Sequence, residues 1–123
     1  MAIEEIRKGI PESEISVRED GQGGAYVIAE SAPIGDRFQQ PTTWCGFRIT
    51  FQYPYADCYP HFVDGTLRLR SGAAPSAAGI QPGHVFEGRP ALQLSRRSKR
   101  LNPQTDTAMM KLAKVLLWLG SQR

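Results

Sequence analysis

The sequence predicts an α+β fold in which helices cover one face of a four-stranded antiparallel sheet. Three observations lead to this prediction. Apolar and polar residues alternate over four short segments, which is the two-residue period of a strand with one buried face. Apolar residues recur at helical spacing near both ends of the chain. Clusters of glycine, proline and aspartate separate these segments, as expected for turns.

The first third of the chain predicts a short helix followed by a β-hairpin. Isoleucines at helical spacing predict an amphipathic helix over residues 2–9, with Pro11 just beyond its end. Residues 14–18 and 25–30 alternate as two strands around a glycine-rich turn. Residues 31–41 are polar and rich in turn formers, so a loop is expected there.

The clearest strand is predicted for residues 43–51. One face of it would carry a mainly apolar row, formed by Thr43, Cys45, Phe47, Ile49 and Phe51. Cys45 is therefore expected to be buried and inert, because apolar surroundings raise the pKa of a thiol. Residues 61–69 are predicted to be the fourth strand, or a tight hairpin centred on Asp64-Gly65.

The last part of the chain predicts a loop and a helix. The small residues of 71–83 indicate a mobile loop. A helix is predicted over 105–119, capped by Thr105 or Asp106 and stopped by Gly120. Its broad apolar arc consists of Ala108, Met109, Leu112, Ala113, Val115, Leu116 and Leu119, widened by Met110 and Leu117.

The opposite stripe of this helix carries Lys111, Lys114 and Trp118. A tryptophan on a polar stripe is either packed by a neighbouring element or presented to a partner, and the pattern leaves both alternatives open.

Composition bounds the class of protein. With 123 residues, the chain is expected to form a single domain, 1–123, around one core. No window reaches the roughly 20 apolar residues of a membrane span. The N-terminal segment lacks the apolar core of a secretory signal, and two cysteines are too few for a disulfide scaffold, so the cytoplasm is the expected compartment. The net charge of +3 is compatible with acidic partners without identifying one.

The order of these elements and several motifs resemble the ubiquitin-conjugating enzyme (UBC-like) superfamily, in a divergent prokaryotic branch. The segment WCGFRITFQYPYADCYPHF is similar to the family's third strand, YPxxPP-like turn and fourth strand. LNPQTDTAMMKLAKVLLWL is similar to its W-S-P turn and following helix, with Leu101 in place of the tryptophan. HVFEGRPAL matches the stretch between them, where the family carries an HPN motif and the catalytic cysteine.

Under this resemblance the catalytic site is vestigial. Counting from Gly88, the family's cysteine falls at Ala91, whose methyl group cannot attack a thioester. His84 is not followed by the Pro-Asn that would support an oxyanion. The resemblance therefore implies a non-catalytic variant that binds a ubiquitin-like modifier or its activating or conjugating enzyme, with no cofactor. We expect Ala91 to lie in a shallow groove between the turn at 53–60 and the loop at 95–103.

Six residues are predicted to contact the partner. Trp44 and Trp118 are the expected hot spots, since tryptophan dominates interfaces when it is desolvated. Arg89, Arg96, Arg97 and Lys99 are expected to surround the groove and to hold a carboxylate or acidic residues.

Three alternatives stay open. Cys58, with His61 as a nearby base, is the alternative nucleophile of an active conjugating enzyme. The basic run SRRSKR at 95–100 would suit nucleic acid, although no aromatic residue interleaves its cations to stack on bases. A zinc site made of Cys45, Cys58, His61 and His84 is disfavoured, because no pair has the tight spacing of a structural site. Without a catalytic cysteine at the family's position, the sequence favours a binding module over an enzyme.

Overall fold

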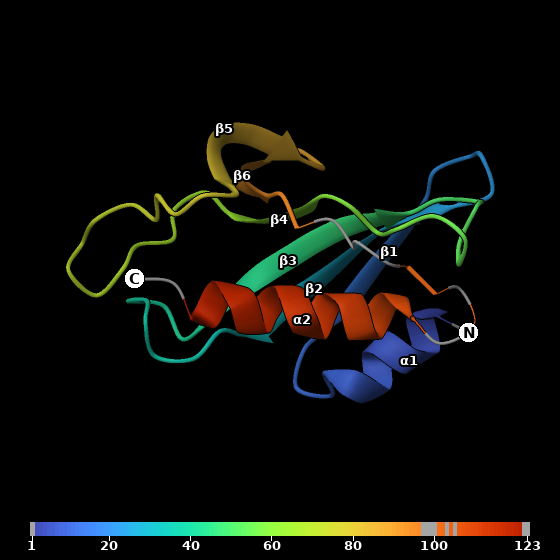
Figure 1. The fold of residues 1–123 in the computed structure, drawn as a ribbon, viewed down its shortest axis with the longest axis horizontal. Coiled ribbons are helices and arrows are strands. Elements are labelled where there is room, and N and C mark those ends of the chain that lie inside the picture. The colour runs from blue at the N-terminus through green and yellow to red at the C-terminus, as the bar shows by residue number, and fades with distance from the viewer. Residues whose placement is uncertain (1, 97–100, 103, 105, 122–123) are drawn as a thin grey trace.

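The computed structural model describes residues 2–96, 101–102, 104 and 106–121. Within these described residues, two helices and six strands make up the fold (Figure 1). They are α1 (Ala2–Gly9), β1 (Ile15–Glu19), β2 (Ala25–Pro33), β3 (Thr42–Ile49), β4 (His61–Asp64), β5 (Ile80–Phe86), β6 (Arg89–Leu94) and α2 (Ala108–Gly120).

The predicted α+β class is confirmed. All strands pair antiparallel in one sheet with the order β1-β2-β3-β4-β6-β5, so β1 to β4 form the predicted meander. The first helix and the first three strands lie close to their predicted positions. Phe51 is an exception on the third strand. The chain turns after Ile49, and the Tyr53 N–H donates to the carbonyl of Thr50 at 3.0 Å, so Phe51 points into solvent instead of continuing the apolar row.

The predicted strand count of four is wrong, and so is the extent of the fourth strand. β4 ends at Asp64 because its carboxylate accepts hydrogen bonds from the N–H and the hydroxyl of Thr66, at 2.9 and 2.8 Å, which closes a turn. Leu67 is buried beyond this turn without belonging to a strand, and that burial explains the misleading alternation.

The expected loop at 71–83 is only partly present. Its last residues belong to β5, which begins at Ile80 and pairs with β6. The pairing is irregular, with a register shift between Gln81 and His84, and Pro82 and Gly83 lie at the shift. The sequence pattern did not predict β5, because Pro82 and Gly83 are turn-forming residues inside the strand.

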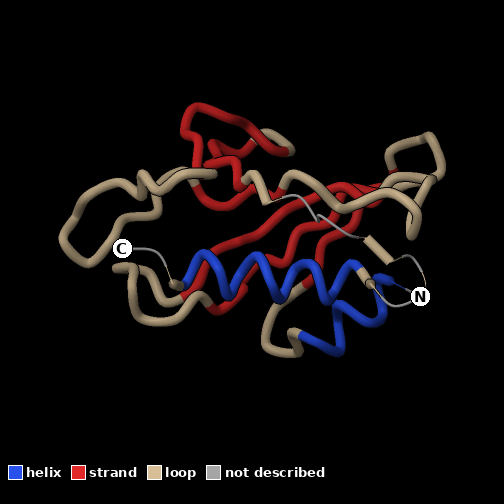
Figure 2. The backbone as a smooth tube through the Cα atoms, viewed as in Figure 1, coloured by secondary structure: helices blue, strands red, loops and turns tan. Residues whose placement is uncertain are grey.

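The helices form a second layer on one face of the sheet (Figures 1 and 2). The main core lies between the two layers. Its largest fully buried side chains include Ile6 of α1, Phe47 of β3, and Leu112 and Leu119 of α2. Each such side chain contributes about 1.5–3 kcal/mol through burial, so packing between the layers dominates the stability of the fold. Cys45 is fully buried in this core, which confirms its predicted position.

The C-terminal helix begins three residues later than predicted. Thr107 is its N-cap, and its hydroxyl accepts the N–H of Met110 at 3.1 Å. Thr105 lies outside the described residues. Asp106 instead accepts the N–H of Asn102 at 2.8 Å. The predicted apolar arc is too broad, because Met110, Ala113 and Leu117 are exposed.

The β5–β6 hairpin bends over the opposite face of the sheet, which we call the outer face (Figure 1). Phe86 near its tip packs on Ile28 and Ala91, flanked by Tyr26, Trp44 and Phe62. A Cβ atom at Gly46 would lie 2.4 Å from the Phe86 ring, so glycine is required there. The hairpin thereby gives the outer face a small core of its own.

Within the part of the chain that the structure describes, no helix has the length and apolar character needed to cross a membrane.

Candidate functional site

A groove of about 230 Å³ runs along one face of α2. One wall is the turn that follows β3, and the other is formed by described residues between β6 and α2. The lining residues are Tyr53, Pro54, Ala56, Asp57, Cys58, Arg96, Leu101, Asp106, Thr107, Ala108, Met110, Lys111, Lys114, Val115 and Trp118. The groove therefore lies between the turn at 53–60 and the described part of 95–103, the two segments expected to bound the groove at Ala91, but Ala91 does not line it.

Hydrogen bonding fixes the turn against the helix. The hydroxyl of Tyr53 accepts the N–H of Ala108 at 3.0 Å. That N–H belongs to the first turn of α2, where no intrahelical carbonyl is available to it. Residues 52–55 form a tight turn, since the Tyr55 N–H donates to the Gln52 carbonyl at 2.7 Å. The hydrogen bond from Ala108 to Tyr53 thus fixes the groove wall to the first turn of α2, and it also gives this helical N–H the acceptor that it otherwise lacks.

An ion pair connects the same two elements farther along the groove. Nζ of Lys111 lies 3.1 Å from a carboxylate oxygen of Asp57, and the two side chains are only 11% and 16% exposed. Low exposure strengthens such a pair and makes the loss of one partner costly.

Two cations at the groove have no salt bridge to an acidic residue within the described ranges. The Arg96 guanidinium lies over the Trp118 ring, 4.8 Å from its centroid. Lys114 is exposed one helical turn from Trp118. Trp118 itself is half-buried. It packs against the main core and approaches Gly79, and it also lines the groove. Arginine on an aromatic face keeps its N–H groups available for a carboxylate.

Cys58, the alternative nucleophile, lines the groove but is buried. Only 4% of the residue is accessible, and burial together with the Asp57 charge raises the pKa of its thiol to about 11. His61 is fully buried with its ring 4.9 Å from that of Phe47, and neither ring nitrogen has a described hydrogen-bond partner. Burial, aided by Lys111, lowers the pKa of His61 to about 3, so this imidazole is a very weak base.

The prediction that Ala91 lies in a surface groove is wrong, because this residue is buried. Residues 84–92 form the hairpin, whose two-residue turn has positive φ at both Glu87 (50°) and Gly88 (78°). Ala91 therefore lies within β6, between Asp64 of β4 and His84 of β5, and is 2% exposed. His84 is half-buried near Phe62 on the outer face, 6.2 Å between ring centroids.

The predicted partner-binding residues divide between two surfaces. Trp44 and Arg89 lie on the outer face, where the Arg89 guanidinium is 5.4 Å from the Trp44 ring centroid. Arg89 forms a two-pronged ion pair with Glu30, at 2.8 and 3.0 Å, and it is not among the residues that line the groove along α2. Arg96 and Trp118 do lie together at the groove. Arg97 and Lys99 are outside the described residues.

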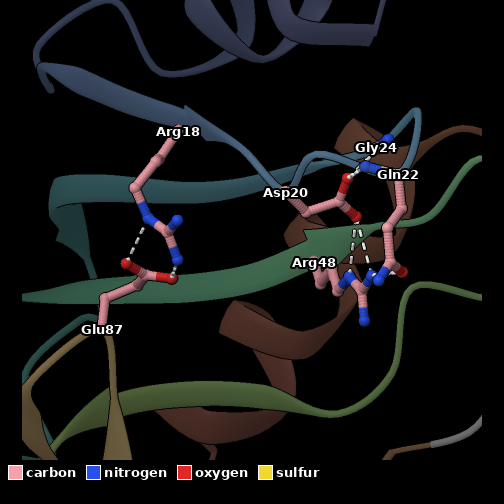
Figure 3. Close-up of polar contacts among 6 residues, drawn as sticks. All are labelled: Arg18, Asp20, Gln22, Gly24, Arg48 and Glu87. Carbon is pink, nitrogen blue, oxygen red and sulfur yellow. Dashed lines mark hydrogen bonds and ion pairs between the residues drawn. The ribbon is translucent and has the colours of Figure 1, made fainter.

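On the outer face, three arginines lie over aromatic rings, an arrangement that could suit nucleic acid. These are Arg18 and Arg48 over Tyr26, and Arg89 over Trp44. Each of the three arginines, however, has an acidic partner. Figure 3 shows Arg18 on Glu87, at 2.6 and 2.8 Å, and Arg48 on Asp20, at 2.8 and 3.0 Å. A backbone hydrogen bond from Gln22, together with Arg48 and a second backbone hydrogen bond from Gly24, lowers the pKa of Asp20 to about 2. These internal pairs neutralise the cations that a nucleic-acid phosphate would need.

The residues considered for zinc do not converge. Cys45 and His61 belong to the helix side of the sheet, whereas His84 belongs to the outer face. Among the described residues, no group of three or more His, Cys, Asp or Glu side chains is placed to hold a metal ion.

Sequence reasoning expected the segments 53–60 and 95–103 to border a groove, but it did not single out Tyr53, Asp57 and Leu101 within them, nor the face of α2 as the floor. The available signal was the helical stripe of Lys111, Lys114 and Trp118, which is the face of α2 that lines the groove.

Comparison of the chain with protein-family models, with curated proteins and with solved structures found no match.

Proposed function

We propose that the chain is a catalytically inactive, ubiquitin-conjugating-enzyme-like module that binds a protein of a bacterial ubiquitin-like modification pathway. The order α1, then the meander β1 to β4, with a Tyr-Pro turn between β3 and β4, agrees with the resemblance drawn from the sequence. The β5–β6 hairpin departs from it, since it occupies the stretch aligned with the family's catalytic segment.

The groove along α2 is the observation that carries this proposal. It combines apolar walls, such as Leu101 and Met110, with the two cations Arg96 and Lys114 that lack a described acidic partner. An extended peptide segment with an acidic residue or a terminal carboxylate would satisfy both features, through apolar contact and charge-assisted hydrogen bonds. Trp118 at the groove supplies the large rigid surface typical of interface hot spots.

The chemistry of Cys58 favours binding over transfer. With a pKa of about 11, its thiolate fraction at neutral pH is roughly one in ten thousand. His61 cannot compensate as a base, because burial keeps its pKa near 3. The alternative function, an enzyme that carries a thioester on Cys58, is distinguished from binding by the following experiment.

The test compares what the immobilised chain retains from a lysate of its native host at low salt. Wild type is set against Arg96→Ala/Lys114→Ala, and against Lys8→Ala/Arg37→Ala, which removes two exposed cations that do not line the groove. We expect wild type and the control variant to retain a ubiquitin-like protein, or its activating or conjugating enzyme, and the groove variant to lose it. Retention should fall as salt rises.

Two outcomes would contradict the proposal. Equal retention by the groove variant and wild type would exclude the groove as the binding surface. An adduct that resists a phosphine reductant, is cleaved by hydroxylamine and is absent from Cys58→Ser would be a thioester, and it would instead establish the conjugating-enzyme alternative.

A further inference from the structure

The two edges of the sheet differ in their ability to pair with another strand. β5 is interrupted by Pro82, Gly83 and the register shift, which are features that keep an edge strand from pairing. β1 contains no proline or glycine, and its five residues pair with β2 in unbroken register. Of the two edges that the structure describes, β1 is therefore the one whose backbone is regular enough to pair with another strand.

Backbone groups of β1 point away from the sheet at regular intervals. The Glu30 N–H donates to the Glu14 carbonyl at 2.9 Å, and the Asp20 N–H donates to the Gly24 carbonyl at 3.0 Å. Because bonded and non-bonded pairs alternate in an antiparallel ladder, residues 14, 16, 18 and 20 face β2. The N–H and carbonyl groups of residues 15, 17 and 19 then face outward, where the described sheet has no further strand.

Glu19 at the end of β1 is charged and exposed, but the side chains at the middle of the strand do not block this edge. Those of Ser16 and Arg18 lie on the outer face, bound to Glu30 and Glu87. Val17, at the midpoint of the strand, is 41% exposed. A charged residue pointing along the edge would block a second strand, whereas an exposed valine would gain by being covered.

We propose that β1 pairs antiparallel with β1 of a second copy of the chain, about a two-fold axis at Val17. The outward groups at residues 15, 17 and 19 are symmetric about Val17, so the same three residues of the second copy satisfy them all. Ile15 then faces Glu19, and Ser16 faces Arg18, so no like charges are directly opposed. This self-complementarity is what favours a second copy over an extended segment of another protein. No residue that lines the groove along α2 lies on β1.

A cross-link tests the register directly. In a bonded antiparallel pair the two Cα atoms lie about 5.5 Å apart, which is within disulfide range. Val17→Cys should therefore form a disulfide-linked dimer under mild oxidation. Val85→Cys is the matched control, because Val85 is 68% exposed on the interrupted β5 edge and should stay monomeric. Cys45 and Cys58 are buried and should not compete.

Sedimentation of the unmodified chain provides the second measurement. Wild type should approach twice the 13.6 kDa monomer mass as concentration rises. Val17→Lys should stay monomeric with an unchanged circular dichroism spectrum, and Val85→Lys should behave as wild type. A wild-type chain that is monomeric at every concentration, or equal cross-linking of the two cysteine variants, would overturn the proposal. The first result would leave the edge to an extended segment of another protein.

Discussion

Lys111 of α2 and Asp57 of the turn after β3 form an ion pair at 3.1 Å in which both side chains are largely buried. The pair connects the helix to the wall of the groove, next to the hydrogen bond from the Ala108 N–H to the Tyr53 hydroxyl. A groove between two elements persists only if something holds those elements at a fixed distance. The ion pair and the hydrogen bond supply this restraint from opposite ends of the turn.

Replacing Lys111 by Met should lower the free energy of unfolding by about 2 kcal/mol, because the Asp57 carboxylate is left partly desolvated without this partner. Asp57→Asn/Lys111→Met should recover part of that loss, since both charges are then removed. Chemical denaturation of the two single variants and the double variant gives the coupling energy. A coupling indistinguishable from zero would show that the pair does not hold the wall.

His61 should make the stability of the fold depend on pH. Its pKa is lowered to about 3 when folded, against an ordinary value of 6.5, so below pH 6.5 the unfolded chain binds a proton that the folded chain excludes. The unfolding free energy should thus fall as pH drops from 6.5 to 4.5. Its slope should approach about 1.4 kcal/mol per pH unit, the value for uptake of one proton on unfolding. His61→Leu should flatten this slope and raise stability at pH 5. An unchanged slope in that variant would rule out His61 as its origin.

Gly46 should be intolerant of a side chain because the Phe86 ring covers it. Gly46→Ala would place a methyl group within 2.4 Å of the ring, and the overpacking should destabilise the fold by about 1–3 kcal/mol. Gly46→Ala/Phe86→Leu should be less destabilised than the sum of its single variants, since the smaller side chain makes room. Additive losses in thermal unfolding would argue that the hairpin does not rest on β3 at this point.

The sequence predicted β3 well because a central strand has partners on both sides and one face in the core. Under those conditions alternation directly reports burial, as it does for Cys45 and Phe47. The same pattern failed at Phe51, where a turn bond to Thr50 redirects the chain. Alternation cannot show where a strand stops, because the turn that ends it depends on backbone bonds and not on side-chain polarity.

The β5–β6 hairpin and the groove were harder to predict for a different reason. The hairpin contains Pro82 and Gly83, so its local signal indicated a loop, and its position on Gly46 results from packing against a distant strand. Ala91 was assigned to a groove because the family resemblance placed the catalytic position there, although pairing with β4 buries it. The groove brings together Asp57 and Lys111, which are far apart in sequence, and only tertiary structure shows that they meet.

Neither thiol should react rapidly in the folded protein. Burial raises the pKa of Cys45 to about 12 and that of Cys58 to about 11, and the thiolate is the reactive form. Cys58 should nevertheless be modified before Cys45, because Cys58 lines the groove whereas Cys45 lies inside the main core and needs an opening of the fold. Following the mass of Cys45→Ser and Cys58→Ser during treatment with a thiol reagent separates the two rates, and both thiols should react fast in denaturant. Rapid native labelling of Cys58→Ser, which retains only Cys45, would contradict the burial of that thiol.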